Sequence, residues 1–177
     1  MKLLEEFSQK HVRVLFILFA INAIALTYFG GYLKEYTPLP KLDFMISGYT
    51  KTNIMSLISA YGDSGINVYY WLTILDMPFP FLLFGFTVGY VVPQLQKWCY
   101  TNLARLVFVL VGAFLLFDMI ENITVLILLK YGFTWVGDRW ITISSVATQI
   151  KLISLILVYS ILLFVWIRTI LQKITKS

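Results

Sequence analysis

The sequence has little charge, one cysteine and one histidine. Only 13% of its 177 residues are charged, against roughly 25% in a soluble domain, so the chain lacks the polar surface that a water-facing globule needs. The single cysteine, Cys99, excludes an intrachain disulfide and a thiolate metal cluster. The single histidine, His11, lies beside Lys10 and near Arg13, and without a second histidine it is a poor anchor for a metal ion or haem. The sequence predicts no metal site and identifies no cofactor.

The net charge of +5 does not indicate a nucleic-acid partner. Lysines and arginines lie at the ends of apolar runs rather than in one patch, which is typical of charges that set membrane orientation. Hydrophobic residues make up 59% of the chain and aromatic residues 17%. Tryptophan collects at membrane–water interfaces. The sequence therefore predicts that the tryptophans form belts at the two interfaces: Trp71, Trp98, Trp135, Trp140 and Trp166.

Four apolar runs are long enough to cross a bilayer, whose hydrocarbon core needs about 20 apolar residues in a helix. They cover approximately residues 12–33, 68–92, 103–129 and 141–167. The first run is too long for a signal peptide and no small-residue cleavage site follows it, so we expect it to be retained. The sequence therefore predicts one all-α membrane domain, a bundle of four transmembrane helices.

A short amphipathic helix is predicted between the first two runs. Thr50 can cap its start and Gly62 can end it. The apolar side chains between them share one helix face: Ile54, Leu57, Ile58 and Tyr61. We expect this helix to lie on the membrane surface or over the mouth of the bundle.

The loop charges predict an orientation. One side of the bundle collects most of the positive charge: Lys2, Lys10, Arg13, Lys97, Arg105, Arg168, Lys173 and Lys176. The opposite side has fewer basic residues, diluted by acids: Lys34, Lys41, Lys51, Lys130 and Arg139, with Glu35, Asp43, Asp63 and Asp138. The more positive side is expected to face the cytoplasm, so the sequence predicts a cell-membrane protein with both termini in the cytoplasm and the longer loops outside the cell.

Polar side chains lie within the predicted spans at one depth, counted from the outer helix ends. The set comprises Asn22, Asp76, Asp118, Glu121, Asn122, Thr148, Gln149 and Lys151. Asp118, Glu121 and Asn122 follow the i, i+3, i+4 spacing of one helix face. Because each charge costs about 2.5–3.5 kcal/mol at the centre of a span, we expect these groups to point into the bundle.

Three carboxylates and one ammonium leave an excess of two negative charges within the spans. Either one or two of the acids are protonated, or a cation or cationic ligand joins them. Pro78 and Pro80 lack an N–H, so the carbonyls of Ile74 and Asp76 lose their helical donors and a kink beside Asp76 is predicted. The alternative is a satisfied polar network that only fixes helix register, with a kink that only serves packing.

Five segments carry a resemblance: Gly48-Tyr49-Thr50, Tyr61-Gly62-Asp63-Ser64-Gly65 with Tyr69, Asp76-Met77-Pro78-Phe79-Pro80, Phe117-Asp118-Met119-Ile120-Glu121-Asn122, and Ala147-Thr148-Gln149-Ile150-Lys151. With them the chain resembles a widespread family of small four-span microbial membrane proteins that has no assigned activity. Where such relatives often carry an arginine after the second loop glycine, this chain has Ile66 and Asn67. The resemblance implies that the acids, Asn122 and Lys151 form a shared unit, but it supplies no reaction.

The leading hypothesis is a pocket that binds, and could modify, a membrane lipid or another amphiphile. Any acid–base chemistry is assigned to Asp76, Asp118 and Glu121, with Lys151 as electrostatic partner. The residues assigned to ligand binding are Asn122, Thr148, Gln149, Asn22 and Tyr69. The alternatives are proton or cation transport by a homo-oligomer, and an accessory subunit whose ionic layer pairs with a partner's spans.

Overall fold

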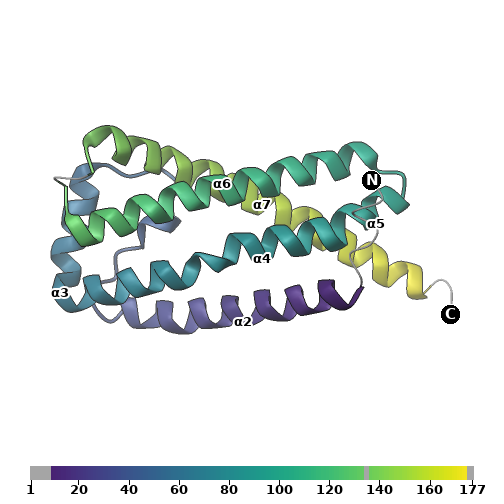
Figure 1. Ribbon diagram of the computed structural model, residues 1–177, viewed down its shortest axis with the longest axis horizontal. Helices are drawn as coiled ribbons and strands as arrows, with labels where there is room; N and C mark the ends of the chain where they lie inside the picture. The colour runs from purple at the N-terminus through teal and green to yellow at the C-terminus, as the bar shows by residue number, and fades with distance from the viewer. Residues whose placement is uncertain (1–8, 134–135, 175–177) are drawn as a thin grey trace.

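The chain folds into a bundle of long helices in the computed structural model, which describes residues 9–133 and 136–174 (Figure 1). The α-helices are α2 (Gln9–Leu33), α3 (Lys51–Asp76), α4 (Pro78–Phe86), α5 (Val92–Lys97), α6 (Thr101–Tyr131) and α7 (Asp138–Ile174). A short 3-10 helix, η1 (Leu42–Phe44), and a π-helix, η2 (Thr87–Val91), complete the described elements. No strand occurs in those two ranges.

Four helices are long and apolar enough to cross a membrane: His11–Leu33, Lys51–Lys97, Thr101–Tyr131 and Asp138–Gln172. The second of them is the run of α3, α4, η2 and α5, which follow one another with little interruption. The predicted all-α architecture with four spans is thus confirmed, and the protein is a membrane protein. Among the residues used to predict interfaces and orientation, Lys2, Trp135, Lys176 and the side chains of Lys10 and Lys173 lie outside the described part.

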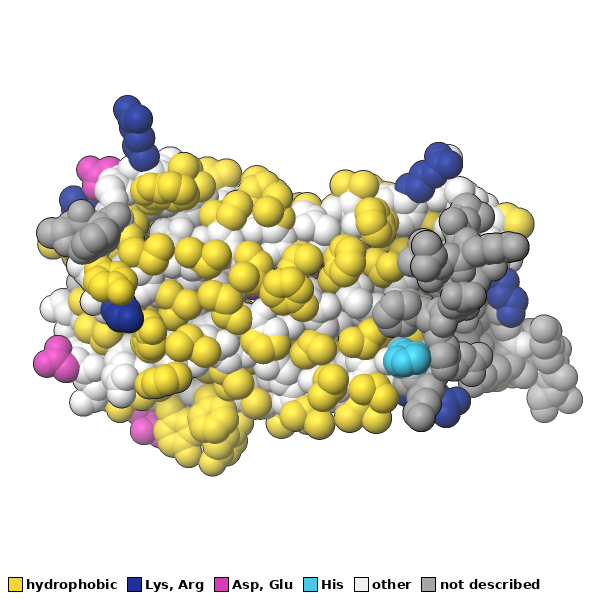
Figure 2. All heavy atoms as spheres, in the orientation of Figure 1, with side chains coloured by type: hydrophobic (Ala, Val, Ile, Leu, Met, Phe, Trp, Pro, Cys, Tyr) yellow, Lys and Arg dark blue, Asp and Glu magenta, His cyan; other side chains and the backbone are white. Residues whose placement is uncertain are grey.

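The long sides of the bundle are apolar, as a lipid-facing surface must be. Large hydrophobic side chains such as Ile24, Val109 and Leu163 are exposed there. In Figure 2 hydrophobic side chains cover the middle of the visible face, while Lys and Arg lie toward both ends and Asp and Glu toward one end. Since α2 begins and α7 ends at the same end of the bundle (Figure 1), the other end carries the loop between α2 and α3.

The first part of α3 is the predicted amphipathic helix. Thr50 forms a capping box with Asn53, and Gly62 interrupts the helix with φ 58° and ψ −175°. This segment lies across the end of the bundle opposite the termini (Figure 1). Its apolar face is buried through Ile54, Leu57 and Tyr61, so it covers that end of the bundle.

The predicted kink lies between α3 and α4, at Met77. The carbonyl of Ile74, which would face Pro78 in a regular helix, accepts a hydrogen bond of 3.2 Å from the Met77 N–H instead. The side chain of Asn22 in α2 donates to the Leu75 carbonyl at 3.0 Å. Protein donors therefore serve two carbonyls at this kink, and the kink holds α2 against α3.

Candidate functional site

An ion pair network joins α6 to α7 inside the bundle. The Lys151 ammonium lies 2.9 Å from Asp118 Oδ1 and forms a second ion pair with Glu121 Oε2. These three side chains are almost inaccessible, with exposed fractions of 4% for Lys151, 3% for Asp118 and 0% for Glu121. One ammonium thus serves two carboxylates, which leaves a formal charge of −1 in the interior.

Two neutral side chains complete this network. The Asn122 amide donates to Asp118 Oδ2 at 2.9 Å. The Thr148 hydroxyl donates to Glu121 Oε1, and both Asn122 and Thr148 have no exposed surface. We call these five residues, Asp118, Glu121, Asn122, Thr148 and Lys151, the ionic cluster. The i, i+3, i+4 spacing on α6 brings its three members to the face that packs against α7.

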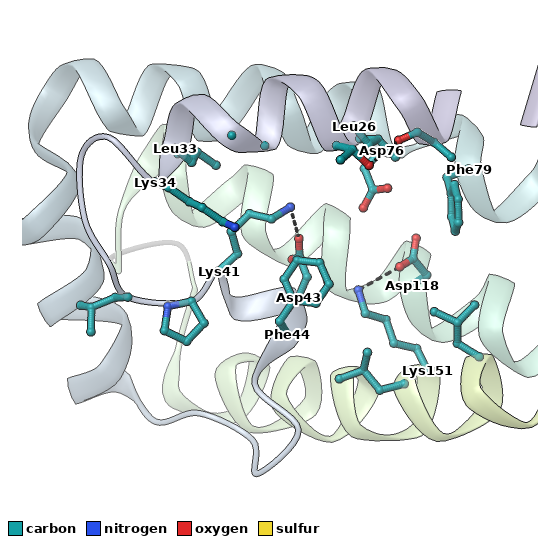
Figure 3. A pocket seen from close by; sticks show the side chains of 18 of the residues that line it. Leu26, Leu33, Lys34, Lys41, Asp43, Phe44, Asp76, Phe79, Asp118 and Lys151 are labelled. Atoms are coloured by element: carbon teal, nitrogen blue, oxygen red, sulfur yellow. Dashed lines mark hydrogen bonds and ion pairs between the residues drawn. The ribbon is translucent and has the colours of Figure 1, made fainter. Parts of the chain in front are cut away.

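A cavity of about 990 Å³ lies beside the ionic cluster, at the end of the bundle that carries the loop between α2 and α3. Asp118 and Lys151 form part of its wall (Figure 3). Much of the remaining wall is apolar and comes from four helices: Ala23, Leu26, Phe79, Phe114, Leu152 and Leu155. The structure therefore combines a largely apolar chamber with a charged patch.

Asp76 lies apart from the ionic cluster, on the opposite wall of the cavity. Figure 3 shows the Asp76 and Asp118 carboxylates pointing toward one another across it. Asp76 is half-buried, and within the described ranges no hydrogen bond or ion pair reaches its carboxylate. Of the acids predicted for the site, Asp76 is the one that faces the cavity without a protein partner.

Asp43 and Lys41 also line the cavity, and sequence reasoning missed both. The sequence predicts both as charges of the outer side of the bundle, yet Asp43 is 7% exposed and its Oδ2 lies 3.0 Å from the Lys41 ammonium. Burial opposes ionisation of Asp43, but the charges of Lys41 and Lys151 outweigh it and lower the pKa of this carboxyl. The available signal was the apolar flank of Asp43, namely Leu42 and Phe44.

The other predicted binding residues lie outside the cavity wall. Asn22 is engaged with the Leu75 carbonyl, and Gln149 lies against Gly48 of the outer loop. Tyr69 is 1% exposed and packs against Tyr61 in the apolar core, with its hydroxyl unpartnered within the described part of the chain. Asp76, Asp118 and Lys151 are thus the predicted residues that a molecule in the cavity would contact directly.

The half of the bundle nearer the termini is filled by apolar side chains. One buried group there comprises Leu83, Val111, Phe114 and Val158, and the next comprises Val91, Val92, Leu95, Ala104, Val107 and Val165. The ionic cluster and the cavity therefore belong to one half of the membrane-spanning region. Within the described residues, no group of three or more His, Cys, Asp or Glu side chains could hold a metal ion.

Comparison with protein-family models, with curated proteins and with solved structures gave no match. The resemblance to a four-span microbial family therefore stays a prediction.

Proposed function

We propose that the protein binds a lipid or another amphiphile in the cavity between α2 and α7. The observation that carries this proposal is a chamber of about 990 Å³, with largely apolar walls and a charged patch, inside a membrane protein. Pockets for small molecules typically measure about 300–1,000 Å³ and combine apolar walls with a few polar groups. An amphiphile matches this arrangement, because its apolar chain can pack against the walls while its head group contacts the charged side chains.

The arrangement of the helices supports entry from the bilayer. α2 packs against α3 and α4, whereas α7 packs against α6 and η1. The cavity is lined on the α2 side by Ala23 and Thr27, and on the α7 side by Leu155 and Tyr159. Thr27 and Tyr159 are exposed. A chain lying in the lipid can therefore pass between α2 and α7 without first entering water.

The same geometry limits the chemistry. Asp118 and Glu121 share Lys151, whereas Asp76 faces the cavity without a protein partner. If the protein modifies its ligand, Asp76 is the carboxylate best placed to exchange a proton with it, because a general acid or base must reach the reacting group directly. Lys151 then acts through Asp118 as an electrostatic partner.

Thermal unfolding in a neutral detergent, across a panel of phospholipids, fatty acids, sterols and long-chain amines, tests the proposal. We expect at least one class to raise the melting temperature of the wild type. Leu155→Trp, which fills the cavity, should abolish that rise. Ile156→Trp, at an exposed position on the same helix, should retain it.

The proposal fails if no member of the panel stabilises the wild type. A wild type that no member of the panel stabilises, together with an Asp118→Asn variant as stable as the wild type, would count most heavily against a pocket.

Transport of protons or cations is the rival function. A path across the membrane would have to pass the apolar half of the bundle, where Val91, Leu95 and Val165 have no exposed surface. That packing favours binding over conduction by a single chain. Ion flux into proteoliposomes that depends on Glu121 would reverse this preference, and tight vesicles would sustain it.

We place the protein in the cell membrane, with both termini in the cytoplasm. The support is the excess of lysine and arginine at the end of the bundle where α2 begins and α7 ends. In this orientation the cavity opens toward the outer leaflet.

A further inference from the structure

We infer that the ligand of this cavity is a cationic amphiphile, a single apolar chain with an amine whose ammonium group is held by Asp76. This inference rests on the proposed function, since it names the chemical class of the molecule bound there.

The lysines that line the cavity deep in the fold are engaged. Lys151 is shared by Asp118 and Glu121, and Lys41 is paired with Asp43 at 3.0 Å. The remaining lining lysine, Lys34, is exposed near the loop. An anionic head group would therefore find no unpaired buried lysine among the described residues, and it would meet the carboxylates of Asp43, Asp76 and Asp118.

The carboxylates, by contrast, outnumber the lysines that could pair with them. The carboxylates of Asp43, Asp76, Asp118 and Glu121 face two buried or half-buried lysines, Lys41 and Lys151. Lys34, which also lines the cavity but is exposed, brings the formal sum over these four acids and three lysines to −1. Excess charge in a low-dielectric interior requires a counter-charge or neutralisation.

One acceptor that faces the cavity lacks a donor. The Asp76 carboxylate faces the cavity with no partner in the described ranges (Figure 3). Asp76 is also half-buried, so a molecule in the cavity can reach this carboxylate. A protonated amine supplies several N–H donors together with a positive charge, so one group can meet both the hydrogen-bonding and the charge requirement.

The side chains around Asp76 determine where the apolar chain of the ligand lies. Phe79 lies one helical turn further along the same broken helix, and Phe114 and Leu155 line the wall on α6 and α7. These side chains continue from the carboxylate toward the apolar half of the bundle. An ammonium at Asp76 therefore places its chain along apolar walls and between α2 and α7, where it reaches lipid.

The test is equilibrium binding to the purified full chain in neutral-detergent micelles at pH 7. The probes are dodecylamine, dodecanol and dodecanoate, which share one chain and differ in head group. Dodecylamine is charged at this pH, as a lysine side chain is. We expect dodecylamine to bind the wild type at least about tenfold more tightly than either other probe.

Variants locate the interaction. Asp76→Asn should weaken dodecylamine binding about ten- to a hundredfold and leave dodecanol binding unchanged, as expected for loss of a charge-assisted hydrogen bond. Asp63→Asn is the matched control, because Asp63 is an exposed acid on the same helix outside the cavity wall. It should change nothing. If Asp76→Asn fails to fold, the three probes on the wild type decide alone.

The failures of the two proposals are distinguishable. Equal binding of the three probes, unaffected by Asp76→Asn but abolished by Leu155→Trp, would overturn the cationic ligand and leave the amphiphile cavity standing. Binding of none of the probes to the wild type would overturn the cationic ligand. If the wider panel also gave no stabilisation, the cavity proposal would fall with it.

Discussion

At the residue scale the central group is Lys151, the ammonium on which two buried carboxylates depend. Asp118 and Glu121 come from one face of α6, and Lys151 comes from the facing side of α7. An ion pair of this kind contributes little net stability compared with an apolar core, because both charges lose their hydration. Removing one partner is different, since the other charge is then left buried and unpaired.

Lys151→Met should accordingly lower the free energy of unfolding by about 3–5 kcal/mol. The substitution keeps the length of the side chain, so the loss reflects the two stranded carboxylates rather than a cavity. Denaturant titration in mixed micelles, followed by circular dichroism, measures the change.

Lys51→Met is the control for that experiment. Lys51 is also paired with an acid, Asp138 at 3.1 Å, but the Lys51 side chain is 48% exposed and that of Asp138 is 78% exposed. An exposed ion pair contributes about 0–1 kcal/mol, so Lys51→Met should be nearly neutral. Equal effects of the two substitutions would show that burial of the Lys151 network does not matter.

Residue spacing predicted part of the site and missed the rest for a physical reason. The shared face of Asp118, Glu121 and Asn122 follows from helix periodicity, which is local in sequence. The position of Asp43 depends on a loop that folds back against α7 and brings η1 to the cavity. No local sequence pattern predicts that the loop folds back, so Asp43 could not be distinguished from a solvent-facing charge.

At the element scale the run from Lys51 to Lys97 is one helix with three interruptions. Gly62 turns the chain at the end of the bundle, the kink at Met77 brings Asn22 of α2 to Leu75, and η2 inserts a π-helical turn before Pro93. In η2 the Val92 N–H donates to the Thr87 carbonyl, five residues back. The interruption at Gly62 and the kink at Met77 were predicted from glycine and proline. The π-helix was not, because its extra residue depends on packing.

Gly62→Ala should destabilise the protein through the backbone alone. The φ of 58° and ψ of −175° belong to a region that glycine adopts and other residues avoid, and no atom lies within 4 Å of a Cβ built there. We expect a loss of about 1–3 kcal/mol in the free energy of unfolding, measured by the same titration.

Gly137→Ala provides the comparison for the change at Gly62. A Cβ at Gly137 also meets nothing within 4 Å, and its φ is not positive. Because Gly137 directly precedes α7, where glycine caps a helix better than alanine, this variant should lose less than about 1 kcal/mol. A Gly62→Ala protein as stable as Gly137→Ala would mean that the turn between the two parts of α3 is not strained.

At the scale of the whole molecule, the sequence predicted four spans because hydrophobic length is a property of each segment alone. The placement of α2 and α7 on opposite sides of the cavity could not be predicted in that way. It depends on α2 packing against α3 and α4 while α7 packs against α6. Neighbour relations between helices follow from side-chain fit along their whole lengths, which apolar composition does not specify.

The proposed orientation can be tested with the one natural cysteine. Cys99 is exposed at the end of the bundle where α5 meets α6. A membrane-impermeant maleimide should leave Cys99 unlabelled in intact cells and label it after permeabilisation. In a Cys99→Ser background, Ser47→Cys in the exposed part of the outer loop should be labelled in intact cells. The reverse pattern would invert the topology.

The central claim is that the cavity between α2 and α7 holds an amphiphile in the native membrane. Native mass spectrometry of protein released from that membrane in a neutral detergent tests it most directly. We predict a bound molecule of defined mass on the wild type and on Ile156→Trp, and its loss from Leu155→Trp. Wild-type protein that carries no bound molecule, or the same molecule retained in full by Leu155→Trp, would contradict the claim.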